Sequence, residues 1–513
     1  MKNKIFLKKY ASFLIPFLLF AFAFISRSIK ANFFPLWGDE FITARWTRLD
    51  YMLEYHHFDN NAPLAPVINL FFKQIFNNNY YAQRFPQILM GALSVLVFYQ
   101  MMRHFLSRRW ATLFSLITAT SFILIFYSQE IRPYSYLLFF TLVTFYYGYK
   151  VVVEGDRSWG KILLLILSFA LLPFTHYISW FHFISLDVAL IIVILLLGTH
   201  KLQKVLQLIT LNVFIILAYI PWADSVYYYI LQNLTIRSNP LAKYHFSTRV
   251  FWETIDKFSG ATGLWSRFLF VICITTMAYV VLRLIKRWLK KQEISSFDKF
   301  AFMLIPYSLI FFFLITRAKY TEDIFFWRHY IFLIWPFYVL IFYGLWTLAR
   351  QTIKFRFLSI LTKITVVFII GFFLISNIIN TTAYLLAPHR FYDWRSIVDF
   401  IEPMIVSGQK QKVYVDNPGD LRMYVETQIP YERSRKIWQA VGQIKREQIK
   451  EISRCCAKGA IFIRISTTNE EPPGPIPGFA QMKTIGRSKY LDFLIKRGAA
   501  PYSGWYELHV IYY

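Results

Sequence analysis

Residues 11–40 read ASFLIPFLLFAFAFISRSIKANFFPLWGDE, and the fold can be argued outward from this stretch. Four lysines in the first nine residues precede an apolar run from about Ala11 to Ile25, and no A-x-A cleavage pattern accompanies it. We expect this run to be an uncleaved first transmembrane helix. About ten residues further on stand two adjacent carboxylates, Asp39 and Glu40. This spacing places the two acids at or just outside the membrane surface. Ionisable groups are costly there, so they tend to have a function or a partner.

The composition also indicates an integral membrane protein. The chain has 513 residues, of which 56% are hydrophobic and 20% aromatic, and its mean hydropathy is +0.41. A soluble domain of this size could not be so apolar. The formal net charge of +27 does not indicate nucleic-acid binding, because Lys and Arg cluster in short runs between apolar segments. Such runs set membrane topology and contact anionic headgroups. The three cysteines suggest no disulfide framework.

We expect about eleven membrane crossings from the apolar runs. Besides the first helix, these runs lie near residues 84–105, 111–127, 134–153, 162–174, 178–197, 205–222, 268–284, 300–315, 330–348 and 358–379. The apolar segment 62–76 is short, begins with prolines and contains Lys73, so we interpret it as a re-entrant or interfacial helix. The count would be thirteen if this segment and a second marginal span, within 223–266, both crossed the membrane.

Charge alternation predicts which connections share a side of the membrane. With a cytoplasmic N-terminus, the turns at 103–109, 150–161, 201–204, 283–299 and 350–363 should be basic, and all five are. The loop after the first helix and the connections 128–133, 175–177, 223–266 and 317–329 then lie outside. Asp39, Glu40 and Glu130 are therefore expected on the non-cytoplasmic side. An odd number of crossings places the C-terminus there as well.

The composition changes from about residue 388. Segments 412–415 (KVYV), 460–465 (AIFIRI) and 507–512 (ELHVIY) are typical of short strands, and 433–453 is typical of a charged helix. We therefore predict an all-α polytopic membrane domain at 1–387, with an outer loop at about 30–83 that carries the acidic pair and is the candidate catalytic loop. A small extracytoplasmic α/β domain at 388–513 follows, in which we find no catalytic constellation.

Three outer segments concentrate charge. The acidic pair is followed by Arg45 and Arg48 along an expected helix, residues 127–134 read YSQEIRPY, and 317–329 ends in Arg328 and His329. Carboxylates can act as general bases, and arginines can hold phosphate and stabilise a leaving group. The alternative is that any one of them is an interfacial anchor. We interpret His176 and His182 as structural. There is no nucleotide-binding loop and no Cys/His cluster.

Five short motifs occur in order along the chain: Gly38-Asp39-Glu40, Pro63-Leu64, Arg84-Phe85-Pro86, the octapeptide SQEIRPYS at 128–135, and Arg328-His329-Tyr330 ahead of Pro336. Together they resemble the glycosyltransferases of the C-type membrane fold (GT-C) that use polyprenyl-phosphate sugars. The sequence is most similar to the bacterial group related to protein O-mannosyltransferases, lipid A aminoarabinose transferase and lipopolysaccharide galacturonosyltransferases. The resemblance covers roughly residues 1–350, and the octapeptide is its most specific element.

The resemblance implies an inverting transfer from an undecaprenyl-phosphate-linked sugar to a lipid, glycan or protein acceptor, at the outer face of a bacterial inner membrane. Asp39 matches the catalytic base, Glu130 matches the second acidic position, and Glu40 is expected to shape the site. Arg132 and Arg328 are candidates for holding the lipid phosphate. Further candidate contacts to the substrate are Arg45, Tyr134 and His329. No metal site or cofactor is indicated, although participation of a divalent cation in the reaction stays open.

One position departs from the pattern. Many relatives carry histidine or lysine immediately before the proline at which this chain has Ala62-Pro63. His56, His57 or Lys73 are the alternatives for that cation. Two other functions stay open: a flippase-like transporter of lipid or polysaccharide, and a non-catalytic membrane assembly factor. A transporter would need polar groups at the midplane of its spans, where this chain has few.

Overall fold

The computed structural model describes most of the helical part of the chain and five strands near its C-terminus. The described residues are 2–34, 36, 38–44, 46, 48–54, 62–76, 79–225, 227, 248–319, 327–350, 356–386, 398–399, 402–403, 412–415, 441–443, 460–467, 481–485 and 506–512. The chain forms two compact units. The first unit comprises residues 1–28, 48–68 and 85–381, and the second comprises 29–47, 69–84 and 382–513.

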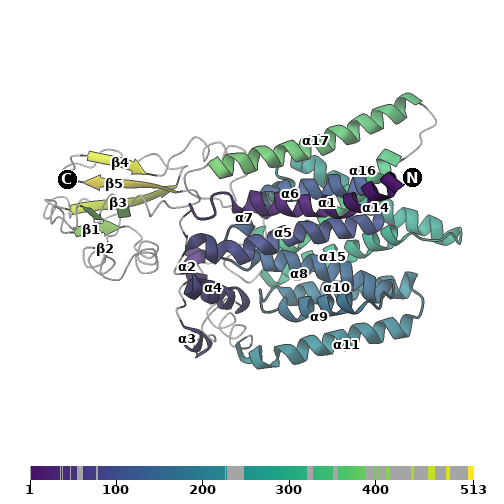
Figure 1. The fold of residues 1–513 in the computed structure, drawn as a ribbon, viewed down its shortest axis with the longest axis horizontal. Coiled ribbons are helices and arrows are strands. Elements are labelled where there is room, and N and C mark those ends of the chain that lie inside the picture. The colour runs from purple at the N-terminus through teal and green to yellow at the C-terminus, as the bar shows by residue number, and fades with distance from the viewer. Residues whose placement is uncertain are drawn as a thin grey trace. The chain divides into compact units, whose positions relative to one another are not determined.

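The described part of the chain is predominantly helical up to residue 386 (Figure 1). Its long helical segments are α1 (Lys2–Ser28), α5 (Tyr80–Phe105), α6 (Arg108–Thr120), α7 (Phe122–Ser128), α8 (Tyr134–Gly148) with η2 (Tyr149–Val153), α9 (Trp159–Leu171), α10 (Ser179–Leu197), α11 (Lys201–Tyr219) with η3 (Ile220–Trp222), α14 (Leu264–Leu289), α15 (Ser296–Lys319), η5 (Trp327–Leu333) with α16 (Ile334–Arg350), and α17 (Arg356–Leu386). The shorter helices are α2 (Gly38–Ala44), α3 (Leu49–Glu54), α4 (Leu64–Ile75) and α13 (Thr248–Ser259).

Among the described residues, eight helices are long and apolar enough to cross a membrane, and α6 with α7 would make nine if this bent pair is one span. The protein is therefore a multi-pass membrane protein, and its membrane part is all-α. The first predicted crossing and the run at 162–174 form shorter apolar helices, Phe13–Ser28 and α9. Segment 62–76 forms the short helix α4.

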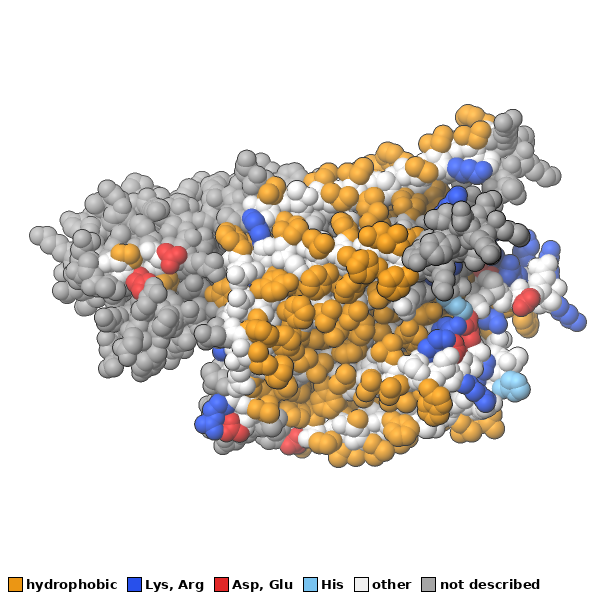
Figure 2. Space-filling model, viewed as in Figure 1, with side chains coloured by type: hydrophobic (Ala, Val, Ile, Leu, Met, Phe, Trp, Pro, Cys, Tyr) orange, Lys and Arg blue, Asp and Glu red, His pale blue; other side chains and the backbone are white. Residues whose placement is uncertain are grey.

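The bundle is built around α8 and α16. Every residue of α8 is buried, and so is most of α16. A helix that is apolar all round belongs inside a bundle. By contrast, α11 and α17 expose large apolar side chains such as Phe214 and Val367. Figure 2 shows these apolar flanks, with Lys and Arg side chains gathered at the end of the first unit where α14 turns into α15.

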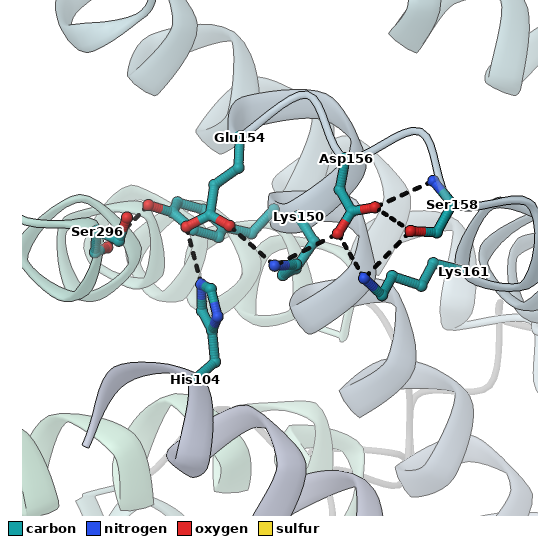
Figure 3. Close-up of polar contacts among 8 residues, drawn as sticks. His104, Lys150, Glu154, Asp156, Ser158, Lys161 and Ser296 are labelled. Atoms are coloured by element: carbon teal, nitrogen blue, oxygen red, sulfur yellow. Dashed lines mark hydrogen bonds and ion pairs between the residues drawn. The ribbon is translucent and has the colours of Figure 1, made fainter. Parts of the chain in front are cut away.

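The basic connections meet at that end of the first unit (Figure 3). His104 Nε2, at the end of α5, lies 2.9 Å from Glu154 Oε1, and Lys150 Nζ lies 3.2 Å from Glu154 Oε2. Lys204 at the start of α11 donates to the carbonyl of Val153, and Tyr149 OH donates to that of Ser296 at the start of α15. Four of the turns that charge alternation predicts to share a side are thus in contact.

The described C-terminal strands form one mixed sheet with the order β2-β1-β3-β5-β4. The strands are β1 (Lys412–Val415), β2 (Val441–Gln443), β3 (Ala460–Thr467), β4 (Gln481–Ile485) and β5 (Tyr506–Tyr512). β1 pairs in parallel with β2 and β3, whereas β5 pairs antiparallel with β3 and β4. The three predicted strands are confirmed. The helix predicted at 433–453 is wrong at β2, which at three residues is too short to show strand alternation, and its remainder lies outside the described residues.

The contacts around Glu154 that join the basic connections should make the stability of the protein depend on pH. Burial opposes ionisation of Glu154, but hydrogen bonds from His104, Ser296 and Lys150 outweigh it and lower its pKa to about 2. The folded pKa is below the ordinary value of 4.5, so the ionised carboxylate stabilises the fold above about pH 4.5. That contribution is lost as the pH falls toward 2.

We therefore expect Glu154→Gln to lower the melting temperature at pH 7, and the gap to wild type to narrow as the pH falls from about 4.5 toward 2. The measurement is thermal unfolding of purified protein in detergent. Glu293→Gln is the matched control, because Glu293 is an exposed acid at the same end. A gap that does not change with pH would contradict this assignment.

Candidate active site

A buried ion pair organises the acidic motif of the second unit. Asp39 and Glu40 lie in the first turn of α2, where the helix dipole favours carboxylates. Glu40 and Arg84 are both fully buried. Arg84 Nη2 lies 2.9 Å from Glu40 Oε2, and Arg84 Nε donates to Oε1 at 3.2 Å. This two-pronged geometry is the strong form of an arginine–carboxylate contact.

Arg84 also fixes the backbone that leads into α2. Its Nη1 donates to the carbonyl oxygens of Ala31 at 2.7 Å and of Phe34 at 2.6 Å. One guanidinium thus joins the turn after residue 28, the first turn of α2 and the start of α5. The R-x-P motif marks Arg84 in the sequence, but nothing in the sequence predicts its partner.

The two acids of the motif consequently differ. Both carboxylate oxygens of Glu40 accept hydrogen bonds from Arg84, so this acid makes a structural contact, and its role in shaping the site stays a prediction. The side chain of Asp39 is half-buried. Asp39 therefore stays the candidate for the base.

The helix α4 supports α2 at its other end. Lys73 Nζ donates to the carbonyl of Ala44, the last residue of α2, at 2.8 Å. Burial lowers the pKa of Lys73. A cation at a helix C-terminus is stabilising. Lys73, one of three alternatives for the cation that Ala62 lacks, thus has a structural contact, whereas His56 and His57 lie outside the described residues.

The helix expected to carry Arg45 and Arg48 beyond the acidic pair is shorter than predicted. α2 ends at Ala44 and α3 begins at Leu49. Arg48 lies between them and forms an exposed ion pair with Asp50 in the first turn of α3. The local carboxylate explains this placement. Arg45 lies outside the described residues.

The octapeptide motif forms the turn between α7 and α8 in the first unit. Glu130 is fully buried, and Arg132 and Tyr134 are nearly so. The ring of Tyr134 lies 4.4 Å from that of Tyr127 and 6.4 Å from that of His176, measured between centroids. Buried charges in a turn between apolar helices are costly, which makes this turn a candidate site.

Arg328 and His329 are half-buried in the first turn of η5. Their neighbour Tyr330 hydrogen-bonds Thr316 through its hydroxyl at 3.0 Å. Further along η5, Phe332 stacks on His182 with centroids 5.4 Å apart. His182 also contacts the hydroxyls of Thr144 and Tyr307, each at 2.9 Å, which fits its structural interpretation.

An apolar cavity of about 250 Å³ adjoins η5 in the first unit. Helices α13, α14, α15 and α16 and η5 contribute its walls, which include Phe258, Cys273, Phe312, Tyr330 and Phe337. Tyr330 thus connects the cavity with the segment that carries Arg328. No local sequence pattern predicts this cavity, because its walls come from helices spread over about ninety residues.

Residues 60–223 match the family described as dolichyl-phosphate-mannose-protein mannosyltransferase. This region belongs to that glycosyltransferase family. It contains the proline-bearing α4, Arg84 and the whole octapeptide motif. The chain is thus a membrane glycosyltransferase of the C-type fold, a class that takes sugars from lipid-phosphate donors.

Solved structures share the fold of this glycosyltransferase over nearly its whole length. ArnT from Cupriavidus metallidurans in the apo state is 13% identical, with a TM-score of 0.52 and 98% of each chain covered. The structure of the same protein bound to undecaprenyl phosphate is 12% identical, with a TM-score of 0.51, and covers 96% of this chain and 97% of that one. No curated protein sequence is significantly similar to the glycosyltransferase.

The Glu40–Arg84 pair should contribute strongly to the stability of this glycosyltransferase. Removing one partner of a buried ion pair leaves an uncompensated charge and costs about 3–5 kcal/mol. We expect Glu40→Gln to lower the free energy of unfolding by that amount in a denaturant titration of purified protein. Glu40→Gln with Arg84→Met should cost less than the sum of the two single changes.

Asp50→Asn is the matched control, because its ion pair with Arg48 is exposed. It should leave the denaturation midpoint unchanged. Additive effects of the two changes at Glu40 and Arg84 would show that the pair has no energetic coupling.

Proposed function

We propose that this glycosyltransferase moves a sugar from an undecaprenyl-phosphate donor to a hydroxyl of a lipid, glycan or protein acceptor, with inversion at the anomeric carbon. The observation that carries the proposal is the buried Glu130–Arg132 turn inside the family-matched region. The binding of undecaprenyl phosphate by ArnT, which has the same fold, supports the choice of donor.

Asp39 is the proposed base. The acceptor oxygen attacks the anomeric carbon while its proton passes to the Asp39 carboxylate. The bond from that carbon to the phosphate oxygen breaks, and its electron pair stays on the departing polyprenyl phosphate. Arg132 and Arg328 would stabilise the charge that develops on this phosphate. Glu130 is the second acid of the site, and Arg45, Tyr134 and His329 are proposed further contacts.

The apolar cavity beside η5 is a proposed location for part of the polyprenyl chain. Tyr330, in its wall, follows Arg328 by two residues. A phosphate held by Arg328 would leave the first isoprene units close to these apolar walls. Because the bilayer is as apolar as the cavity, the chain would be held there by van der Waals packing against the walls.

The proposed topology has eleven crossings. The nine spans that the described helices offer, together with α1 and α9, make up that number. We do not favour thirteen, because α13 has twelve residues and carries Glu253, Asp256 and Lys257. With the N-terminus in the cytoplasm of a bacterial cell, residues 1–387 would form the domain in the inner membrane. Residues 388–513 would then form an extracytoplasmic α/β domain.

Replacement of the proposed base provides the central test. We expect Asp39→Asn to reduce sugar transfer at least a thousandfold, because an amide cannot accept the acceptor proton, while the melting temperature stays close to wild type. The assay follows transfer from a set of purified undecaprenyl-phosphate sugars to a membrane extract. Asp50→Asn is the control acid and should retain activity.

Full activity of Asp39→Asn would refute its role as base. If the wild-type protein transfers no sugar but moves the lipid-linked sugars across vesicle membranes, the transporter alternative is correct. If it does neither, and loss of Asp39 and Glu130 has no effect in cells, the assembly-factor alternative is correct.

The proposal that the cavity holds part of the polyprenyl chain can be tested separately by varying the chain length of the donor lipid. Cys273→Phe would fill it, so we expect the KM for the long-chain donor to rise roughly tenfold, with a much smaller effect on a ten-carbon analogue. Cys273→Ser changes the polarity but not the volume and is the control. An equal effect on both donors would place the lipid chain elsewhere.

A further inference from the structure

The break between α6 and α7 is closed by side chains from two other helices. The two helices meet at Ser121 with a bend of 57°. Phe122 N donates to Asn377 Oδ1 at 3.1 Å, and the carbonyl of Thr120 accepts from Thr381 Oγ1 at 3.2 Å. Both partners belong to α17. Unsatisfied backbone groups are very costly inside a membrane, so a broken span needs such partners.

The third partner at the break is Arg27, in the last turn of α1. Its Nη1 donates to the carbonyl of Ala119 in α6 at 3.2 Å and to that of Ala23 at 3.1 Å. Its Nε donates to Ser128 Oγ, the first residue of the octapeptide motif, at 3.2 Å. The contact is reciprocal, because Gln129 Nε2 donates to the carbonyl of Arg27 at 2.8 Å.

Arg27 is a fully buried cation, and all of these acceptors are neutral. Burying a charge without a counter-charge is costly, and hydrogen bonds alone repay only part of that cost. A neutral polar side chain could satisfy the same carbonyls more cheaply. The planar fork of a guanidinium, however, can donate in several fixed directions at once, here to α6 and to the motif.

The contact between Arg27 and Ser128 is closely packed against α5. A Cβ at Gly91 in α5 would lie 2.0 Å from Ser128 Oγ and 3.0 Å from Arg27 Nε, so a larger residue there would have to displace the Ser128 side chain. Ser128 Oγ also donates to the carbonyl of Leu124 at 2.6 Å. The first two residues of the motif are therefore held from three sides, and Glu130 and Arg132 follow directly.

We propose that Arg27 is a positioning residue for donor binding: it fixes Ser128 and Gln129 and thereby holds the turn that directs Arg132 at the lipid phosphate. This inference rests on the proposed function, which assigns the phosphate to Arg132. Arg27 itself does not contact the substrate. Its effect on the reaction passes through the backbone of the turn.

The test is Arg27→Lys in the full-length protein, which keeps the charge but not the forked geometry. We expect kcat/KM for the undecaprenyl-phosphate sugar to fall about tenfold to a hundredfold, mainly through a higher KM for the donor. Arg103→Lys is the matched control. Arg103 lies in the last turn of α5, at the end of the first unit where the basic connections meet, and it donates to the carbonyl of Leu106. It should leave the donor KM unchanged.

Two further variants keep the test decisive if Arg27→Lys does not fold. Ser128→Ala removes the acceptor for Arg27 Nε, and Gly91→Ala displaces that acceptor. Either should raise the donor KM, and Ser128→Ala combined with Arg27→Lys should be no worse than Arg27→Lys alone. Wild-type kinetics in every variant that folds, with only the melting temperature lowered, would overturn the proposal and leave Arg27 a purely structural residue.

Binding of undecaprenyl phosphate, measured as the rise in melting temperature on adding the lipid, separates this inference from the proposed function. If the wild-type protein binds the lipid and Arg27→Lys binds it at least tenfold more weakly, the positioning role stands even when no sugar transfer is detected. Equal binding by the two proteins would overturn it.

Discussion

Charges buried among apolar helices must find their partners within the protein, and the rest of this structure depends on that constraint. Glu40 has Arg84, with both side chains fully buried. Arg27 has the carbonyls of Ala23 and Ala119 and the hydroxyl of Ser128. In both cases one guanidinium joins segments that are distant in sequence. The cost of leaving such a group unmatched makes these contacts specific as well as stabilising.

The same constraint explains how the two ends of the first unit differ. At one end, ion pairs such as that of His104 with Glu154 join basic turns whose side chains are partly exposed. At the other end, Glu130 and Arg132 are buried in a turn next to the broken span. A partly solvated network can exchange its partners with water, whereas the buried turn has to be held by the side chains around it. That difference suits a site where a charged substrate group has to be bound.

Much of the membrane domain could be predicted from sequence. The apolar runs predicted the long helices, because a membrane requires long apolar stretches whatever their neighbours are. The short motifs predicted the family of residues 60–223. The prediction failed where local pattern was weak: α2 stops at Ala44, and the strand Val441–Gln443 interrupts a segment that reads as helical. Seven and three residues are too few for a period to be recognised.

The sequence by itself determined that this chain is a multi-pass membrane protein, that four of its basic turns lie together, and which motifs carry acids and arginines. Tertiary structure decided the partners of those residues. It paired Glu40 with Arg84 across 44 positions, placed Arg27 beside Ser128 across 101, and directed Lys73 to the end of α2. The reason is physical: hydropathy and helix period are local properties, whereas the partner of a buried charge is chosen by the packing of helices that are far apart in the chain.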